Sequence, residues 1–173
     1  MGEEHYLEVA RFDRYGLHGR RPMCSLFSID TEFIGMGDPH WDKAADKMLS
    51  LRLIDQPTAE AMRLLWFFGK LLGNTDMHAG NLSFRPSGAD RLELTPAYDM
   101  LPMRYAPSRG GEVPAQEDIH VFRPIPGNEH LFRLAMAAAR VFWHAVSSDR
   151  DISAGFRHIA VARLLHLSTQ IGL

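Results

Sequence analysis

Cysteine is almost absent from this sequence, and so are the apolar runs that membrane proteins carry. Cys24 is the only cysteine in 173 residues, so the chain cannot form an internal disulfide, and such cysteine usage is typical of a reducing cytoplasm. No apolar run approaches the roughly 18–20 residues of a membrane-spanning helix, and no secretory signal peptide opens the chain. We therefore expect a cytoplasmic protein that makes no contact with a membrane.

Lysine is scarce as well, with three residues (Lys43, Lys47 and Lys70) against sixteen arginines. The formal net charge is −2, which argues against a protein that binds nucleic acid directly through bulk electrostatics. The apolar content of 46% and the charged content of 23% are ordinary for a globular protein. The length suits a single domain, residues 1–173.

Several motifs of known catalytic sites are missing. The nine histidines and Cys24 form no Cys-x-x-Cys or His-x-x-x-His pair, which argues against a zinc site, and no Gly-x-Ser-x-Gly elbow of a serine hydrolase is present. Gly35-Met-Gly37 lacks the third glycine of a phosphate-binding loop and is followed by Asp38-Pro39. This segment is better explained as a surface loop that leads into a helix.

The informative stretch is a polar loop, residues 73–83, between an apolar helix and two short strand-like runs. Asp76 and Asn81 are five residues apart, and the strand-like runs 82–84 and 91–94 lead to Asp99 in the segment 94–101. Protein kinases use an Asp to orient the attacking hydroxyl, an Asn five residues later on Mg²⁺, and a second metal-binding Asp after a strand pair. The spacing therefore predicts Asp76 as the catalytic base and Asn81 and Asp99 as Mg²⁺ ligands.

The same residues have structural alternatives. Asn74 or Asp76 could form an Asx turn after the helix, because both residue types are frequent in such loops. Asp99 could be a turn or capping residue after Pro96.

Two motifs carry a family resemblance. Gly73-Asn-Thr-Asp-Met-His-Ala-Gly-Asn-Leu-Ser83, followed by Pro96-Ala-Tyr-Asp-Met-Leu101, resembles the catalytic core of HipA-type serine/threonine kinases, the toxin halves of bacterial toxin–antitoxin pairs. Val9-Ala-Arg-Phe-Asp-Arg14, within segment 6–14, resembles the hinge of that family, which holds adenine by backbone hydrogen bonds. The resemblance runs from about residue 6 to 102 and more loosely through the rest of the chain.

The resemblance implies ATP and Mg²⁺ as cofactors and a protein serine or threonine as substrate. It places Ala10 and Phe12 at the adenine, His78 close to the phosphates, and Tyr98 beside the adenine or ribose. Ala10 stands where the family's hinge often has a carboxylate. From the residues alone, His78 could instead bond to the loop backbone, Tyr98 could pack beneath the loop, and residues 6–12 could form an edge strand.

The hydrophobic pattern predicts a mainly α fold (α+β), and the resemblance implies the helical C-lobe of a protein-kinase-like fold with a small β-hairpin at the active site. Apolar residues at three- and four-residue steps predict a helix over 41–54. A core helix should follow, capped by Asp55 and ended by Gly73. We expect a long loop over 103–127, where kinases carry the activation and substrate-binding segment, and then helices over 128–147 and 153–170, the first of them capped by Asn128.

A complete kinase also needs an N-lobe with a phosphate-covering loop and a strand lysine. Only five residues precede the hinge-like strand, and none of the lysines lies in a suitable strand, so the resemblance implies the C-terminal lobe alone. Two functions follow. The chain is either a catalytic lobe that works with a separate N-lobe chain or missing segment, or an inactive remnant that binds a protein such as an antitoxin-like DNA-binding partner.

Overall fold

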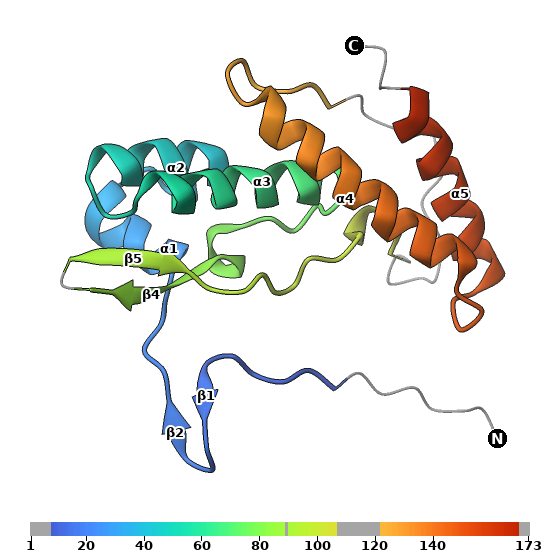
Figure 1. Cartoon of the computed structure of the whole chain (residues 1–173). Helices are drawn as coiled ribbons and strands as arrows, with labels where there is room; N and C mark the ends of the chain where they lie inside the picture. Colours follow the sequence, from blue (N-terminus) through green and yellow to red (C-terminus); the bar gives the residue numbers. More distant parts are fainter. Residues whose placement is uncertain (1–7, 89, 107–121, 170–173) are drawn as a thin grey trace.

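The computed structural model describes residues 8–88, 90–106 and 122–169. The protein is mainly helical with two small sheets, as the hydrophobic pattern predicts (Figure 1). The elements in chain order are β1 (Arg14–Tyr15), β2 (Gly19–Arg20), β3 (Cys24–Ser25), α1 (Leu26–Ile29), the π-helical turn η1 (Asp30–Ile34), α2 (Trp41–Ser50), α3 (Gln56–Leu72), the 3₁₀ turn η2 (Ala79–Asn81), β4 (Ser83–Ser87), β5 (Arg91–Leu94), the 3₁₀ turn η3 (Met103–Tyr105), α4 (Glu129–Ser148) and α5 (Ala154–Thr169).

Helix α3 is the centre of the core, and its ends confirm the predicted boundaries. The Asp55 side chain accepts a hydrogen bond from the Thr58 backbone N–H at 3.0 Å, which satisfies one of the free donors at the helix start. Gly73 ends the helix with φ of 77°, a left-handed conformation that glycine adopts without a steric penalty. The helix packs against α2 on one side and α4 on another, and α4 packs against α5 (Figure 1).

The predicted hairpin forms, but it belongs to a larger sheet. Strands β4 and β5 pair antiparallel, with Phe84 opposite Leu94, and β4 extends to Ser87. On the other edge, β3 pairs with β4, with Cys24 opposite Phe84, so the sheet has three strands, one more than the predicted hairpin. Phe84 is fully buried at its middle, which fixes the sheet to the core.

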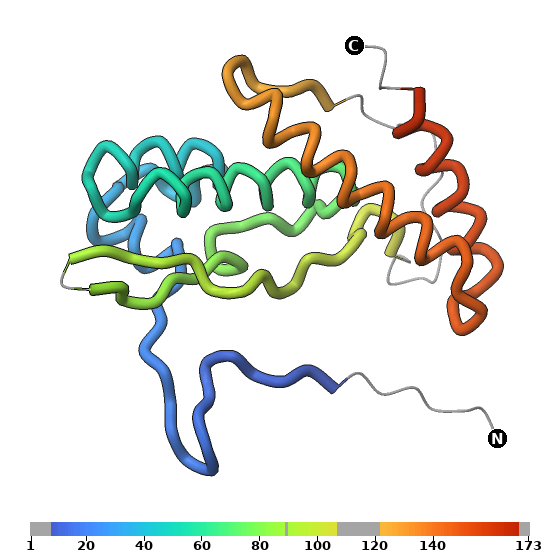
Figure 2. The backbone as a smooth tube through the Cα atoms, in the orientation of Figure 1, coloured from blue at the N-terminus to red at the C-terminus, as the bar shows by residue number. Residues whose placement is uncertain are grey.

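The N-terminal part of the chain holds short elements that the sequence pattern did not predict. Strands β1 and β2 form a separate two-stranded hairpin, which stands apart from the helices in the backbone trace (Figure 2). Residues 8–11 carry no strand, so the described part of segment 6–12 does not form the edge strand considered above, while residues 6–7 lie outside the described residues. The chain then forms α1 and η1 before the expected loop over 35–38 leads into α2.

The remaining helices match their predicted positions within a few residues. Helix α2 ends at Ser50 instead of continuing to Ile54, because Arg52 adopts a left-handed conformation with φ of 59°. Helix α4 begins after Asn128 as expected, but the Asn128 side chain makes no capping hydrogen bond. Residues 107–121 of the predicted long loop, and residue 170 of the last helix, lie outside the described residues. No helix in the described part of the chain is long and apolar enough to cross a membrane.

Candidate active site

The end of helix α3 delivers the polar loop in a fixed direction. The Gly73 N–H donates to the Lys70 carbonyl at 3.1 Å and the Asn74 N–H donates to the Gly69 carbonyl at 2.8 Å. This pair of bonds is the Schellman arrangement, in which a left-handed glycine closes the last turn of a helix. The first residues of the loop are therefore anchored to a helix that packs against both α2 and α4.

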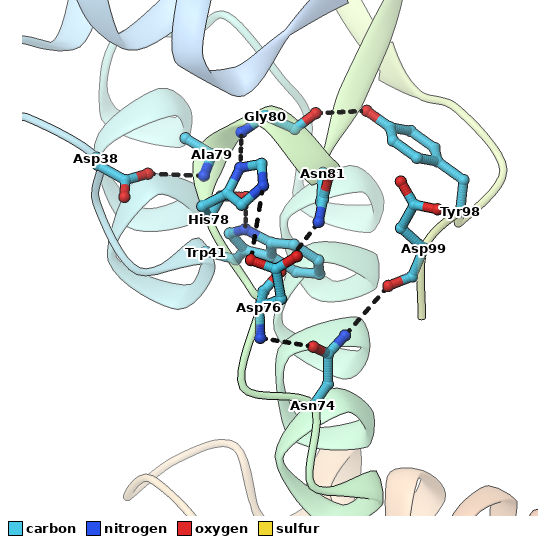
Figure 3. A network of polar contacts seen from close by, with 10 residues as sticks. All are labelled: Asp38, Trp41, Asn74, Asp76, His78, Ala79, Gly80, Asn81, Tyr98 and Asp99. Atoms are coloured by element: carbon cyan, nitrogen blue, oxygen red, sulfur yellow. Dashed lines mark hydrogen bonds and ion pairs between the residues drawn. The ribbon is translucent and has the colours of Figure 1, made fainter. Parts of the chain in front are cut away.

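Asn74 is the residue that joins the two halves of the site. It is only 3% exposed, and its Oδ1 accepts from the Asp76 backbone N–H at 2.8 Å, while its Nδ2 donates to the Asp99 carbonyl at 3.3 Å (Figure 3). The first of these bonds is the Asx turn that the sequence allowed, and it is made by Asn74 and not by the Asp76 carboxylate. The second bond ties the loop to the segment after β5.

The loop itself is held by two further internal bonds. Asn81 Nδ2 donates to the Asp76 carbonyl at 3.0 Å, across the predicted spacing of five residues. His78 Nδ1 accepts from the Gly80 N–H at 2.9 Å, which leaves the proton of a neutral ring on Nε2, 3.8 Å from Asp76 Oδ1. A β-carbon at Gly80 would lie 2.7 Å from the His78 ring, so a side chain at this position would force the ring to shift.

The loop also rests on the segment before α2. The Ala79 N–H donates to Asp38 Oδ1 at 2.7 Å, and Trp41 Nε1 donates to the His78 carbonyl at 3.2 Å (Figure 3). The buried Asp30 carboxylate in turn accepts from the backbone N–H groups of Met36, Gly37 and Asp38. The N–H groups of this loop thus serve an internal carboxylate, which supports its interpretation as a structural loop and not as a phosphate-binding one.

Asp99 is exposed and directly follows Tyr98 in the chain. Asp99 adopts φ of 50°, an uncommon conformation for a residue with a side chain, and one that Asp tolerates better than most. In Figure 3 its carboxylate lies on the same side of the site as Asn81 and Tyr98. Backbone strain of this kind concentrates at functional sites, where the surrounding structure holds it in place.

Tyr98 connects the segment before Asp99 to the loop. Its hydroxyl bonds to Ser83 Oγ at 2.6 Å and donates to the Gly80 carbonyl at 2.9 Å. Burial raises the pKa of the Tyr98 hydroxyl, the bond to Ser83 opposes that shift, and the charge of Asp99 adds to it. The hydroxyl is therefore a neutral bridge, and Tyr98 is half-buried against the loop, with its ring centroid 6.0 Å from that of Phe12.

The chemistry of these side chains fits a magnesium ion bound together with phosphates. Mg²⁺ prefers oxygen ligands and keeps several waters, so one carboxylate and one amide oxygen can suffice. Asn81 uses its Nδ2 for the Asp76 carbonyl, which leaves its Oδ1 as the remaining ligand atom, and the Asp99 carboxylate accepts no hydrogen bond from the described residues, since the bond from Asn74 goes to the Asp99 backbone carbonyl. Within those residues no group of three His, Cys, Asp or Glu side chains forms a metal site, so waters and phosphate oxygens would complete the coordination.

The structure thus gathers most of the residues singled out in the sequence. Asp76, His78 and Asn81 share the loop, and Tyr98 and Asp99 are joined to it through hydrogen bonds. Phe12 reaches the site through the Tyr98 ring, whereas Ala10 is exposed in a segment without regular structure, and no described contact brings it to the other residues.

Three residues that support the site were not assigned this role from the sequence. The sequence predicted Asn74 only as a turn residue, although its position directly after the glycine that ends the helix was a signal for this supporting role. Asp30 and Asp38 act across distances of 6 to 8 and 41 residues in sequence, and no local pattern marks such contacts.

Comparison with known proteins gives the site a context. A family profile described as HipA-like C-terminal domain matches residues 1–162. The chain is 39% identical over 155 residues to Toxin YjjJ of Escherichia coli (strain K12), in an alignment that covers 90% of this chain and 34% of that protein. The chain therefore spans about a third of the length of the curated relative that it matches.

Proposed function

The chain belongs to the HipA-like C-terminal domain family, and from this membership we propose that it is the catalytic lobe of an ATP- and Mg²⁺-dependent serine/threonine protein kinase. One observation carries the proposal. Asn74 and Asn81 hold Asp76 and Asp99, which are far apart in sequence, in one hydrogen-bonded unit at the end of a buried helix (Figure 3). Positioning of this kind is the main requirement of phosphoryl transfer.

Each residue has a role in this proposal. The Asp76 carboxylate orients the hydroxyl of a substrate serine or threonine and accepts its proton as the hydroxyl oxygen attacks the γ-phosphorus and ADP leaves. Asn81 and Asp99 hold Mg²⁺ through oxygen atoms. The bound ion neutralises charge on the phosphates.

The remaining predicted residues border the nucleotide. His78 presents Nε2 beside Asp76, and in this proposal Nε2 contacts a phosphate oxygen of the nucleotide. Tyr98 and Phe12 form an aromatic pair that would flank the adenine or ribose, and the backbone near Ala10 would supply the hinge contact. The helical body then corresponds to the C-lobe of a protein-kinase-like fold.

A second lobe acts with this one in our proposal. Lys43 and Lys47 lie on α2 and Lys70 lies on α3, so none of the three lysines can serve as the strand lysine that a kinase uses for its phosphates. A further segment or a separate N-lobe chain would supply that lysine together with the phosphate-covering loop. The relative is named a toxin, and we propose for this chain a toxin–antitoxin role with an antitoxin-like DNA-binding partner.

Two variants separate the proposed roles. In the enzyme reconstituted with its N-lobe, Asp76→Ala should lower kcat about 10²–10⁴-fold while leaving the Mg²⁺-dependent affinity for ATP nearly unchanged. Asp99→Ala should lose that affinity as well as the activity. Transfer of the ATP γ-phosphate to a protein acceptor, measured beside nucleotide binding by calorimetry, distinguishes the two. Full activity in Asp76→Ala would rule out its role as the base.

A further inference from the structure

A basic pocket lies at the C-terminal end of helix α3. Asn74 and Thr75, at the start of the loop, form part of its lining. Its volume is about 380 Å³, which is within the range of small-molecule sites. Three cationic side chains line it, Lys70, Arg104 and Arg163, and no acidic side chain of the described residues does. They come from α3, η3 and α5, so residues distant in sequence build one concentration of positive charge.

Arg163 is the most unusual of these side chains. It is 5% exposed, its Nη2 donates to the Leu71 carbonyl at 3.1 Å, and its buried Nε has no hydrogen-bond partner among the described residues. Burial lowers the pKa of Arg163, and Arg104 lowers it further against the opposing effect of Tyr105. A buried guanidinium with an unpaired N–H is unfavourable unless an anion or another acceptor compensates it.

Lys70 adds a second charge that is partly removed from water. Its Nζ lies 4.2 Å from the centroid of the Trp66 ring, so the side chain is held over an aromatic face. Burial lowers the pKa of Lys70, and Arg104 adds to that shift. Asp42 on α2 opposes it, but this carboxylate does not line the pocket and makes no ion pair with Lys70.

We propose that this pocket binds a phosphate group, either inorganic phosphate or the phosphate monoester of a phosphorylated serine or threonine. Such a group carries close to two negative charges and three strong acceptor oxygens, which match the unpaired N–H of the buried Arg163 guanidinium and the Lys70 ammonium better than a single carboxylate would. The Thr75 hydroxyl adds a donor beside them. This site is separate from the Asp99 site and does not depend on kinase activity.

Calorimetric titration of the intact chain tests the proposal. The probes are inorganic phosphate, O-phosphoserine in a short peptide, and acetate, all in EDTA so that no metal ion can bridge a phosphate to Asp99. Lys70→Gln removes one charge from the pocket without removing a described hydrogen bond. Lys47→Gln is the matched control, because Lys47 is exposed on α2 and does not line the pocket.

We expect the intact chain to bind a phosphate probe saturably. Lys70→Gln should weaken this binding at least tenfold, and so should Arg163→Lys, provided that the variant is folded. Lys47→Gln should change the affinity less than twofold. Tighter binding of the peptide would identify a phosphorylated residue as the occupant of the pocket. Tighter binding of inorganic phosphate would identify a free anion as the occupant. Absence of saturable binding, equal affinity for acetate, or equal weakening by Lys47→Gln would overturn the proposal. None of these results alters the test of Mg²⁺-dependent ATP binding, so the two proposals fail separately.

Discussion

Substitution of Asn74 by alanine tests the claim that one buried amide holds the two halves of the site together. The change removes the 2.8 Å bond to the Asp76 N–H and the 3.3 Å bond to the Asp99 carbonyl. Each hydrogen bond contributes about 0.5–1.5 kcal/mol net, so we expect a loss of roughly 1–3 kcal/mol in the free energy of unfolding. For a domain of this length, ~2 kcal/mol corresponds to a fall in Tm of about 4–8 °C.

Two assays on the Asn74→Ala variant separate a structural role from a positioning role. Urea denaturation gives the loss of stability, and calorimetry below the melting temperature gives the Mg²⁺-dependent affinity for ATP, which we expect to fall about tenfold because Asp99 is no longer held. Thr75→Ala is the matched control, since Thr75 is exposed and makes no hydrogen bond with the described residues, and it should change stability by less than about 0.5 kcal/mol. A stability loss no larger than that of Thr75→Ala would refute the reasoning, and unchanged nucleotide affinity would limit Asn74 to a structural role.

Three further substitutions test the frame of the site. Gly73→Ala places a side chain at φ of 77° with its Cβ 3.1 Å from Tyr105, so thermal unfolding should show a loss of about 1–2 kcal/mol, and an unchanged Tm would contradict the helix-end geometry. Tyr98→Phe removes the hydroxyl bridge but keeps the ring, so urea denaturation should show a loss of about 1–2 kcal/mol while nucleotide affinity stays within about threefold. The hydrogen bond from Thr58 lowers the pKa of Asp55 below its ordinary value, so the stability that Asp55 provides is present above that ordinary pKa and is lost as pH falls through the folded-state pKa. The stability gap between wild type and Asp55→Ala should therefore narrow in acid, and a gap that is constant down to pH ~2 would contradict this.

Local signals in the sequence were enough to place the central helix and the loop. Asp55 and Gly73 mark the ends of α3 by capping chemistry that acts within a few residues, and the spacing of Asp76 and Asn81 is a property of the loop alone. The grouping of Asp99 with Asp76 and Asn81 could be predicted because the two antiparallel strands between Asn81 and Asp99 bring the chain back toward the loop.

The parts that could not be predicted depend on contacts between distant segments. Strand β3 contains only Cys24 and Ser25, too short for an alternating pattern, and it exists because β4 offers an edge to pair with. The pocket formed by Lys70, Arg104 and Arg163 arises from the crossing of separate elements, and nothing in the local sequence of any one of them indicates it.

The most direct test of the proposed function is calorimetric titration of this chain with ATP, with and without Mg²⁺, in wild type, Asp99→Ala and Asp90→Ala. Asp90 is an exposed carboxylate in the turn between β4 and β5 and serves as the control for loss of charge. We predict that Mg²⁺ strengthens ATP binding in wild type and Asp90→Ala, and that Asp99→Ala weakens the Mg²⁺-dependent affinity at least tenfold. Equal Mg²⁺-dependent binding by Asp99→Ala and wild type would contradict the metal site at Asp99, and absence of binding by wild type would contradict a lobe that holds nucleotide unaided.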